Sequence, residues 1–343
     1  MSGGDAGARG APRVGLIVNP FAGRDVRRLV APAGSLSNYE RAVMVRRLLA
    51  GLRATGVREV LYMPEDYGIV TGAAAESPGI AALPALERAG DSPAESTRAA
   101  RAMTAAGVGV IVTLGGDGTN RLVAAGAGET PLLPIPAGTN NAFAEPVEPT
   151  VAGIAAGLVA RAGRRGAARA RCIRRRKRIV VSVDGRSDLA LVDAVLTTDL
   201  AVAGRAVWDP RHVRALMVTQ AEPGVLGLSS LVAAIRPVGV LEPRGAYLEM
   251  GAGTPVRALL TPGVITPTEI RSVRDMPVGS SVVAGPATGT VSLDGERAFE
   301  VREEAVRMTL EAGGPWVVDV RRTLRWAQRQ GFFLSGLGVA ART

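Results

Sequence analysis

The chain has 343 residues, of which 47% are hydrophobic and 21% are charged, and its formal net charge is +10. This composition is typical of a folded protein of about two domains and excludes wholesale disorder. One cysteine and one histidine exclude an intramolecular disulfide, a cysteine-based metal cluster and a histidine-rich metal site. The sequence contains no apolar run of about 18 residues, so no membrane span is predicted. The N-terminus has no apolar signal core, so we expect a cytoplasmic protein.

In the first part of the chain, short apolar runs alternate with segments of helical periodicity. Strands are predicted at 14–18, 59–63 and 107–114, and helices at 40–54 and 92–106. Ser92 followed by Pro93 is typical of a helix start. A further helix is predicted at 151–162, after the apolar segment 132–135. The alternation predicts a parallel α/β nucleotide-binding domain over residues 13–145.

From residue 179 to about residue 300, short alternating apolar runs are broken by Gly and Pro. This pattern predicts a β-rich acceptor domain, which we bound at residues 146–312. The last part, residues 313–343, contains a predicted strand at 315–320 and a helix-like segment after it.

The positive charge is concentrated in residues 161–178, which contain nine arginines and the only lysine, Lys177, but no acid. The rest of the chain sums to about zero. Because the run has no aromatic residue, we predict no specific nucleic-acid binding. A solvated linker is favoured over a surface for nucleic acid, polyphosphate or an acidic membrane. Cys172 and His212, which have no catalytic partner in sequence, are expected to be an inert thiol and a surface residue.

The third strand runs directly into the motif Gly115–Asn120, with the next helix expected at about 120–126. Consecutive glycines allow close approach of a ligand, and successive amides before a helix form a cradle for an anion. Asp117, at the carboxyl end of the strand, is suited to hold a divalent cation or to accept a proton from a hydroxyl. A tight Gly-Asp-Gly turn without a ligand is the structural alternative.

Two other predicted strands end in similar loops, at 19–24 and 136–141, which favours one shared phosphate site. Near the C-terminus, Asp294 and Glu296 lie on a turn in the sequence L-D-G-E-R. A plain hairpin turn explains this last motif as well as a catalytic role does.

The spaced motifs N-P-F-A-G, G-G-D-G-T, P-A-G-T-N-N and D-G-E resemble those of the superfamily of NAD kinases, diacylglycerol kinases and sphingosine kinases. The resemblance covers most of the chain and is closest to the ATP-NAD kinase-like branch that includes acetoin-catabolism protein X. It implies an α/β fold: an N-terminal parallel-sheet nucleotide-binding domain, a β-rich second domain, and a C-terminal segment that returns to the first. It also implies ATP as donor, Mg²⁺ as cofactor and a homo-oligomer.

By this resemblance, Asp117 is the catalytic base on the acceptor hydroxyl. The residues implied to bind phosphate and nucleotide are Asn19, Gly115, Gly116, Gly118, Thr119, Asn120, Gly138, Thr139, Asn140 and Asn141. From the second domain, Asp294 and Glu296 would face the phosphates or a bound Mg²⁺. Asp193 would contact the acceptor, as the one acid kept of the pair with which NAD kinases grip the nicotinamide nucleotide.

We therefore expect a kinase that transfers a phosphoryl group from ATP, or from polyphosphate, to a hydroxyl, with NAD as first acceptor and NADP as product. Two departures from the NAD-kinase pattern leave other acceptors possible. The acidic pair is altered at 191–194, and the loop at 136–141 is closer to the version found in lipid kinases. The other acceptors are a diacylglycerol- or sphingosine-like alcohol and a small metabolite; a non-catalytic nucleotide sensor is a further alternative. The missing G-x-S-x-G and G-x-x-x-x-G-K-[ST] motifs exclude a serine hydrolase and a P-loop enzyme.

Overall fold

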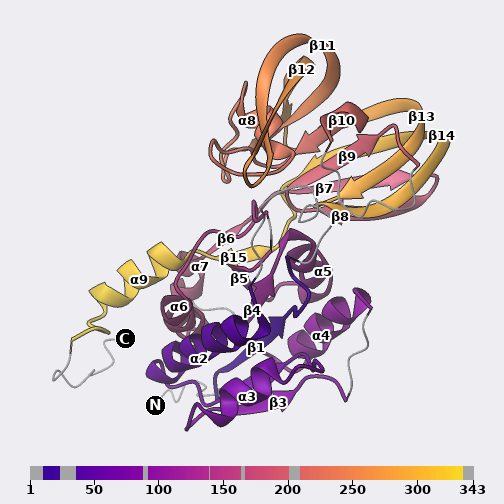
Figure 1. Cartoon of the computed structure of the whole chain (residues 1–343). Helices are drawn as coiled ribbons and strands as arrows, with labels where there is room; N and C mark the ends of the chain where they lie inside the picture. The colour runs from indigo at the N-terminus through magenta and orange to yellow at the C-terminus, as the bar shows by residue number, and fades with distance from the viewer. Residues whose placement is uncertain are drawn as a thin grey trace, which may run out of the picture.

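The computed structural model describes residues 11–23, 36–87, 92–138, 140–163, 167–200 and 209–334, which fold around two β-sheets (Figure 1). The strands of sheet A are, in spatial order, β3 (Ala81–Pro84), β2 (Glu59–Tyr62), β1 (Arg13–Val18), β4 (Val110–Gly115), β5 (Leu132–Pro136), β15 (Trp316–Val318) and β6 (Ile173–Arg175). All neighbours pair in parallel except β15 and β6, which are antiparallel.

Helices cover both faces of sheet A. The apolar core of one face contains side chains of α2 (Asn38–Ala54), α3 (Ile69–Ala75) and α6 (Pro149–Arg161), and that of the other face contains side chains of α4 (Ala94–Ala105) and α5 (Asp117–Ala127). The strand β1 shows why its apolar run is continuous. Leu16 lies in the first core and Ile17 in the second, and both are fully buried.

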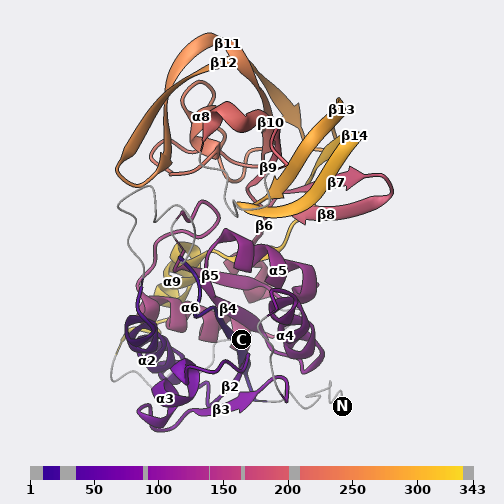
Figure 2. The ribbon, with the colours of Figure 1, turned by 45° about the vertical axis from the view of Figure 1, so that its right-hand side comes forward.

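Sheet B is antiparallel throughout. Its order is β12 (Val264–Pro277), β11 (Arg244–Thr261), β10 (Val213–Val218), β9 (Asp193–Thr197), β13 (Ser281–Leu293), β14 (Glu296–Glu311), β7 (Arg178–Val183) and β8 (Arg186–Ala190). The short 3₁₀ turn η1 (Pro210–His212) precedes β10, and α8 (Ser229–Ala233) packs under the curved hairpin β11–β12. Figures 1 and 2 both show sheet B above sheet A, with α5 directly beneath it. The expected fold class is confirmed.

The chain crosses from sheet A to sheet B at Arg176 and Lys177 and returns at residues 312–315. The two crossings are hydrogen-bonded to each other, from Arg176 N to Pro315 O at 3.0 Å and from Gly314 N to Arg176 O at 3.1 Å. Helix α6, the short helix α7 (Ala167–Cys172) and β6 lie with sheet A. The sequence-based boundary at residue 145 had placed them in the second domain. After β15, helix α9 (Val320–Arg329) packs on α6 and α7.

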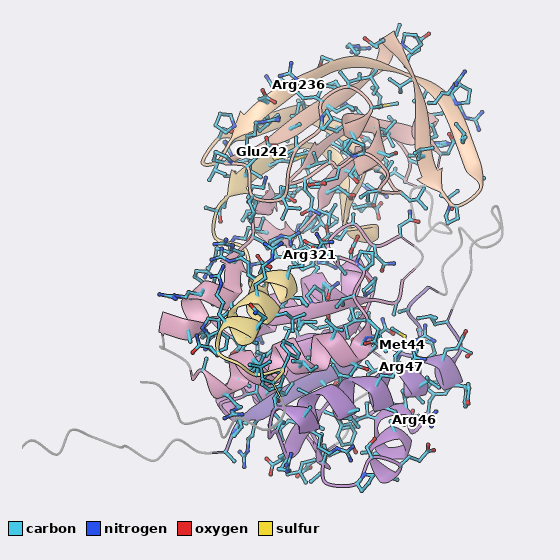
Figure 3. All side chains as sticks on the ribbon, turned by 90° about the vertical axis from the view of Figure 1, so that its left-hand side faces the viewer. Met44, Arg46, Arg47, Arg236, Glu242 and Arg321 are labelled. Carbon is cyan, nitrogen blue, oxygen red and sulfur yellow. The ribbon has the colours of Figure 1, made fainter. Side chains whose placement is uncertain are left out.

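The basic run, residues 161–178, is not a solvated linker in the part that the structure describes. Arg169, Arg176 and Lys177 are all less than 10% exposed, and the run supplies α7 and the edge strand β6. Their buried positive groups find oxygen partners. The ammonium of Lys177 donates to the backbone oxygens of Gly239, Glu242 and Arg244 at 2.6–3.0 Å. Glu242 lies in the sheet B part of the molecule (Figure 3), so this lysine joins the crossing to the second domain.

No helix among the described residues is long and apolar enough to cross a membrane.

Candidate functional site

The glycine motif lies between β4 and α5, at the carboxyl edge of sheet A. Strand β4 ends at Gly115, Gly116 is the N-cap of α5, and Asp117 is already its first helical residue. The helix therefore begins about three residues before the position predicted from the sequence. A Cβ at Gly115 would fall 2.7 Å from the side chain of Thr119, so this tight entry requires glycine. The first-turn amides of α5 have no partner within the helix and make a site for an anion.

Asn19 joins the loop after β1 to the first turn of α5. Its backbone N–H donates to Leu114 O at 3.0 Å, and its side-chain amide donates to Thr119 Oγ1 at 2.9 Å. Its side-chain oxygen accepts the N–H of Phe21 at 2.9 Å. Asn19 and Thr119 thus lie together at the strand ends, as expected from their two motifs.

Asn120 lies behind the glycine motif. It is fully buried, and its side-chain oxygen accepts the hydroxyl of Thr113 on β4 at 2.6 Å. Its side-chain nitrogen has no hydrogen-bond partner among the described residues. Asn120 therefore joins α5 to strand β4 of sheet A. Its side chain is buried and does not face the side of the glycine motif on which phosphates are expected.

The carboxylate of Asp117 bridges the glycine motif to the loop after β5. Its two oxygens accept the backbone N–H groups of Ala142 at 2.8 Å and of Phe143 at 3.0 Å. The same loop is fixed from the second domain, because the side-chain amide of Gln220 donates to Ala142 O. Asp117 therefore helps to set the position of a loop that contacts both parts of the molecule.

The loop after β5 packs backbone to backbone against the glycine motif. A Cβ at Gly138 would lie 2.8 Å from the Cα of Gly116. The side chain of Asn141 closes the loop on itself, accepting Gly138 N at 3.0 Å and donating to Gly138 O at 2.8 Å. Asn140 extends the other way and donates to Leu260 O of β11 at 3.0 Å. Thr139, predicted to bind the nucleotide, is outside the described residues.

The predicted D-G-E motif is the turn of the hairpin β13–β14, and it lies against α5. Asp294 and Gly295 have φ of 50° and 79°, as a two-residue Asp-Gly hairpin turn requires. The carboxylate of Asp294 accepts the N–H groups of Leu191, Val192 and Asp193 at 2.7–3.2 Å. The motif is therefore a hairpin turn whose first acid binds the backbone at residues 191–193, and its catalytic role stays a prediction.

Asp294 and Asp193 form a buried acidic pair. Burial, followed by the charge of Asp193, raises the pKa of Asp294 well above its ordinary value. Asp193 begins β9 and is 9% exposed, and its backbone both donates to and accepts from Asp294. The backbone bonds of Asp294 thus fix the segment in which the acceptor-binding residue was predicted.

Glu296 lies directly over the first turn of α5. A Cβ at Gly118 would fall 2.5 Å from the Cδ of Glu296, so only glycine leaves room for this carboxylate. The side chain of Glu296 is 44% exposed and forms an ion pair with Arg121 at 3.0 Å. The side chain of Glu296 is thus half-exposed, whereas Asp294 is 8% exposed and Asp117, which is partly exposed, binds the amides of Ala142 and Phe143.

Arg121 is the residue that the sequence analysis missed. Its side chain is 8% exposed and bridges α5 to sheet B through Asp188 at 2.7 Å and Glu296 at 3.0 Å. Burial lowers the pKa of Arg121, but the carboxylates of Asp188, Asp294 and Glu296 raise it above its ordinary value overall. The usable signal was its spacing, four residues after Asp117, which places both on one face of a helix.

A second buried arginine, Arg176, lies where the chain crosses from sheet A to sheet B and contacts the loop after β5. Arg176 donates to Gln220 Oε1 at 2.7 Å, and its guanidinium lies 4.8 Å from the centroid of the Phe143 ring. Burial lowers the pKa of Arg176 to about 10, so it stays charged at neutral pH. Cys172 is also buried, and burial raises the pKa of its thiol, in keeping with an inert side chain.

The described residues contain no group of three or more His, Cys, Asp or Glu side chains that would hold a metal ion. Asp117 and Asp294 both turn their carboxylates onto backbone amides. The described residues alone therefore do not form the expected Mg²⁺ site. A separate groove of about 740 Å³ lies on sheet B, lined by Arg214, Tyr247 and others, and holds none of the predicted site residues.

Comparison with known proteins gives matches over both parts of the chain. Residues 14–162 match the family described as the ATP-NAD kinase N-terminal domain. Residues 177–313 match the C-terminal domain of acetoin catabolism protein X, and this match begins where the chain crosses to sheet B. The chain is 37% identical over 342 residues to acetoin catabolism protein X of Cupriavidus necator, covering 94% of each chain.

Proposed function

The chain belongs to the family of acetoin catabolism protein X, with an NAD kinase-type nucleotide-binding domain, and from this premise we propose that it transfers a phosphoryl group from ATP to a hydroxyl. NAD is the first acceptor to test, with NADP as product. The observation that carries the proposal is the position of Glu296, whose half-exposed carboxylate from sheet B lies over the first turn of α5.

The donor phosphates would contact the first-turn amides of α5. Their negative charge is favoured there by the helix dipole and the unpaired N–H groups. Asn19 and Thr119, joined by a hydrogen bond, would line the neighbouring side. Such a site contributes mainly by positioning and neutralising charge, which is the principal demand of phosphoryl transfer.

The proton of the acceptor hydroxyl would pass to Glu296, while Asp117 would act in positioning. The two oxygens of Asp117 already accept the amides of Ala142 and Phe143, so this carboxylate is tied to the loop after β5. Glu296 Oε2 pairs with Arg121, and its other oxygen lies over Gly118. This assignment moves the base from Asp117, the residue implied by the family resemblance, to Glu296.

The test is NADP formation from ATP, Mg²⁺ and NAD by the full chain and by its Glu296→Gln and Asp117→Asn variants. We expect Glu296→Gln to lower kcat by about a hundredfold with little change in ATP affinity. Asp117→Asn should weaken ATP binding as well, because it releases the loop at Ala142. The assignment fails if Glu296→Gln keeps full turnover.

A non-catalytic nucleotide sensor is the second candidate, favoured by the fact that Asp117 and Asp294 both bind backbone amides. A sensor would bind ATP but transfer nothing to NAD, to diacylglycerol, to sphingosine or to small polyols. Turnover with any of these acceptors contradicts it, and turnover with a lipid or polyol alone replaces NAD as the acceptor.

A further inference from the structure

Two exposed aromatic side chains meet at the carboxyl edge of sheet A. Phe21 is 45% exposed and Tyr67 is 49% exposed, on the loops that follow β1 and β2. Their ring centroids are 5.7 Å apart at an interplanar angle of 81°. Aromatic residues make up only 3% of the chain, so an exposed pair from two separate loops is an unusual use of them.

This pair adjoins the phosphate end of the site. Strands β1, β2 and β4 run parallel, so the loops after β1 and β2 and the start of α5 share one edge of the sheet. Asn19 contacts both features, donating to Thr119 Oγ1 at 2.9 Å and accepting from Phe21 N at 2.9 Å. Two residues of chain span at most about 7 Å, which is within the length of a nucleotide.

Both aromatic residues are held by their own loops. The carboxylate of Glu65 accepts Tyr67 N at 2.7 Å and Ile69 N at 2.6 Å, and so fixes the loop to the start of α3. Phe21 is fixed through Asn19 in the same way. A preorganised aromatic surface loses little conformational entropy when a flat ligand covers it.

We propose that Phe21 and Tyr67 bind the planar base of a nucleotide whose phosphates lie at the start of α5. This inference rests on the proposed function and narrows it, because it requires a donor or acceptor that carries a base. Stacking is tolerant of base identity, since every base has a π-face. Inorganic polyphosphate, the alternative donor, would gain nothing from these two side chains.

The experiment compares equilibrium binding of ATP, NAD and inorganic tripolyphosphate to the full chain and to Phe21→Ala, Tyr67→Ala and the double variant. Phe333→Ala is the matched control, because Phe333 is 52% exposed and also meets a neighbouring ring, Phe332, edge to face. We expect the double variant to weaken binding of ATP or of NAD by about tenfold or more. Tripolyphosphate binding should stay within about twofold, and the control should match the wild type.

The ligand that loses affinity identifies the source of the base: ATP for the donor, NAD for the acceptor. Unchanged binding of both by the double variant overturns the inference and leaves the proposed function standing. An equal loss for tripolyphosphate also overturns it, because the variants would then act through Asn19 and the phosphate end. A wild-type chain that binds neither nucleotide nor tripolyphosphate overturns the proposed function itself, and this inference with it.

Discussion

Replacing Arg121 by methionine should loosen the contact between α5 and sheet B. Methionine keeps an unbranched stem that matches arginine as far as the Nε position, but it has no guanidinium to bind the two carboxylates. The perturbed groups are unevenly buried: the side chain of Arg121 is 8% exposed, whereas those of Asp188 and Glu296 are 40% and 44% exposed. The carboxylates can therefore recover water after the substitution, and the cost lies in the lost charge-assisted hydrogen bonds.

The magnitude follows from those bonds. Each bond from a charged group contributes about 1.5–3 kcal/mol when buried, and partial exposure of the acids reduces this to about 1–2 kcal/mol per pair. With two such pairs, the free energy of unfolding of Arg121→Met should fall by about 2–4 kcal/mol in total. Arg98→Met is the matched control. Arg98 is 57% exposed and pairs with Glu95 three residues away, so its loss should cost less than about 0.5 kcal/mol.

The assay is urea unfolding followed by circular dichroism, for Arg121→Met, Glu296→Gln and the double variant. The cycle should give a coupling free energy of about 1–2 kcal/mol between Arg121 and Glu296. Turnover should fall with Arg121→Met, because Glu296 loses the partner that holds it over Gly118. Additive effects, within about 0.3 kcal/mol, would refute the bridge between the two sheets.

Three further substitutions test other contacts. Gly118→Ala places a Cβ 2.5 Å from the Cδ of Glu296, and the flexible Glu296 side chain can move into solvent to make room. We therefore expect kcat to fall about tenfold to a hundredfold while the urea midpoint of unfolding barely moves. A full loss of folding would contradict this. Gly138→Ala places a Cβ 2.8 Å from the backbone of Gly116, which cannot swing away, and should cost about 1–3 kcal/mol in urea unfolding; an unchanged midpoint would contradict it. Burial lowers the pKa of Lys177 from 10.5 to about 8, so above pH 8 the unfolded chain keeps a proton that the folded chain has lost. Relative to Lys177→Met, the stability of the wild type should therefore rise by roughly 2 kcal/mol between pH 8 and pH 9.5 in urea unfolding, and a fall would reverse the sign of the argument.

The alternation of apolar runs and turn residues predicted the central strands β1, β2 and β4 of sheet A, because a strand such as β1 is buried on both faces and its sequence is apolar throughout. It did not predict the edge strands β3 and β6. The start of α5 was placed too late. Gly116 and Gly118 reduce the helix propensity on either side of Asp117, so the sequence of this segment resembles that of a loop. In the structure, Gly118 is needed because the side chain of Glu296 lies against it.

The roles of the buried arginines could not be predicted from local sequence. The partners of Arg121 lie 67 and 175 residues away, and the partner of Arg176, Gln220, lies 44 residues away. A run of arginines has the same appearance in sequence whether it is solvated or inserted between two sheets. Only the tertiary fold decides which of its members find buried oxygen atoms.

The position of β15 has a consequence for the order in which the protein is made. This strand occupies the place between β5 and β6 in sheet A, although the ribosome delivers it after all of sheet B. During synthesis one edge of β5 therefore stays unpaired until residues 316–318 have been translated. A gene fragment that stops after β6 would leave that gap open for good. The two halves are therefore coupled in biosynthesis, and the sheet B part is, in topological terms, an insertion within the first.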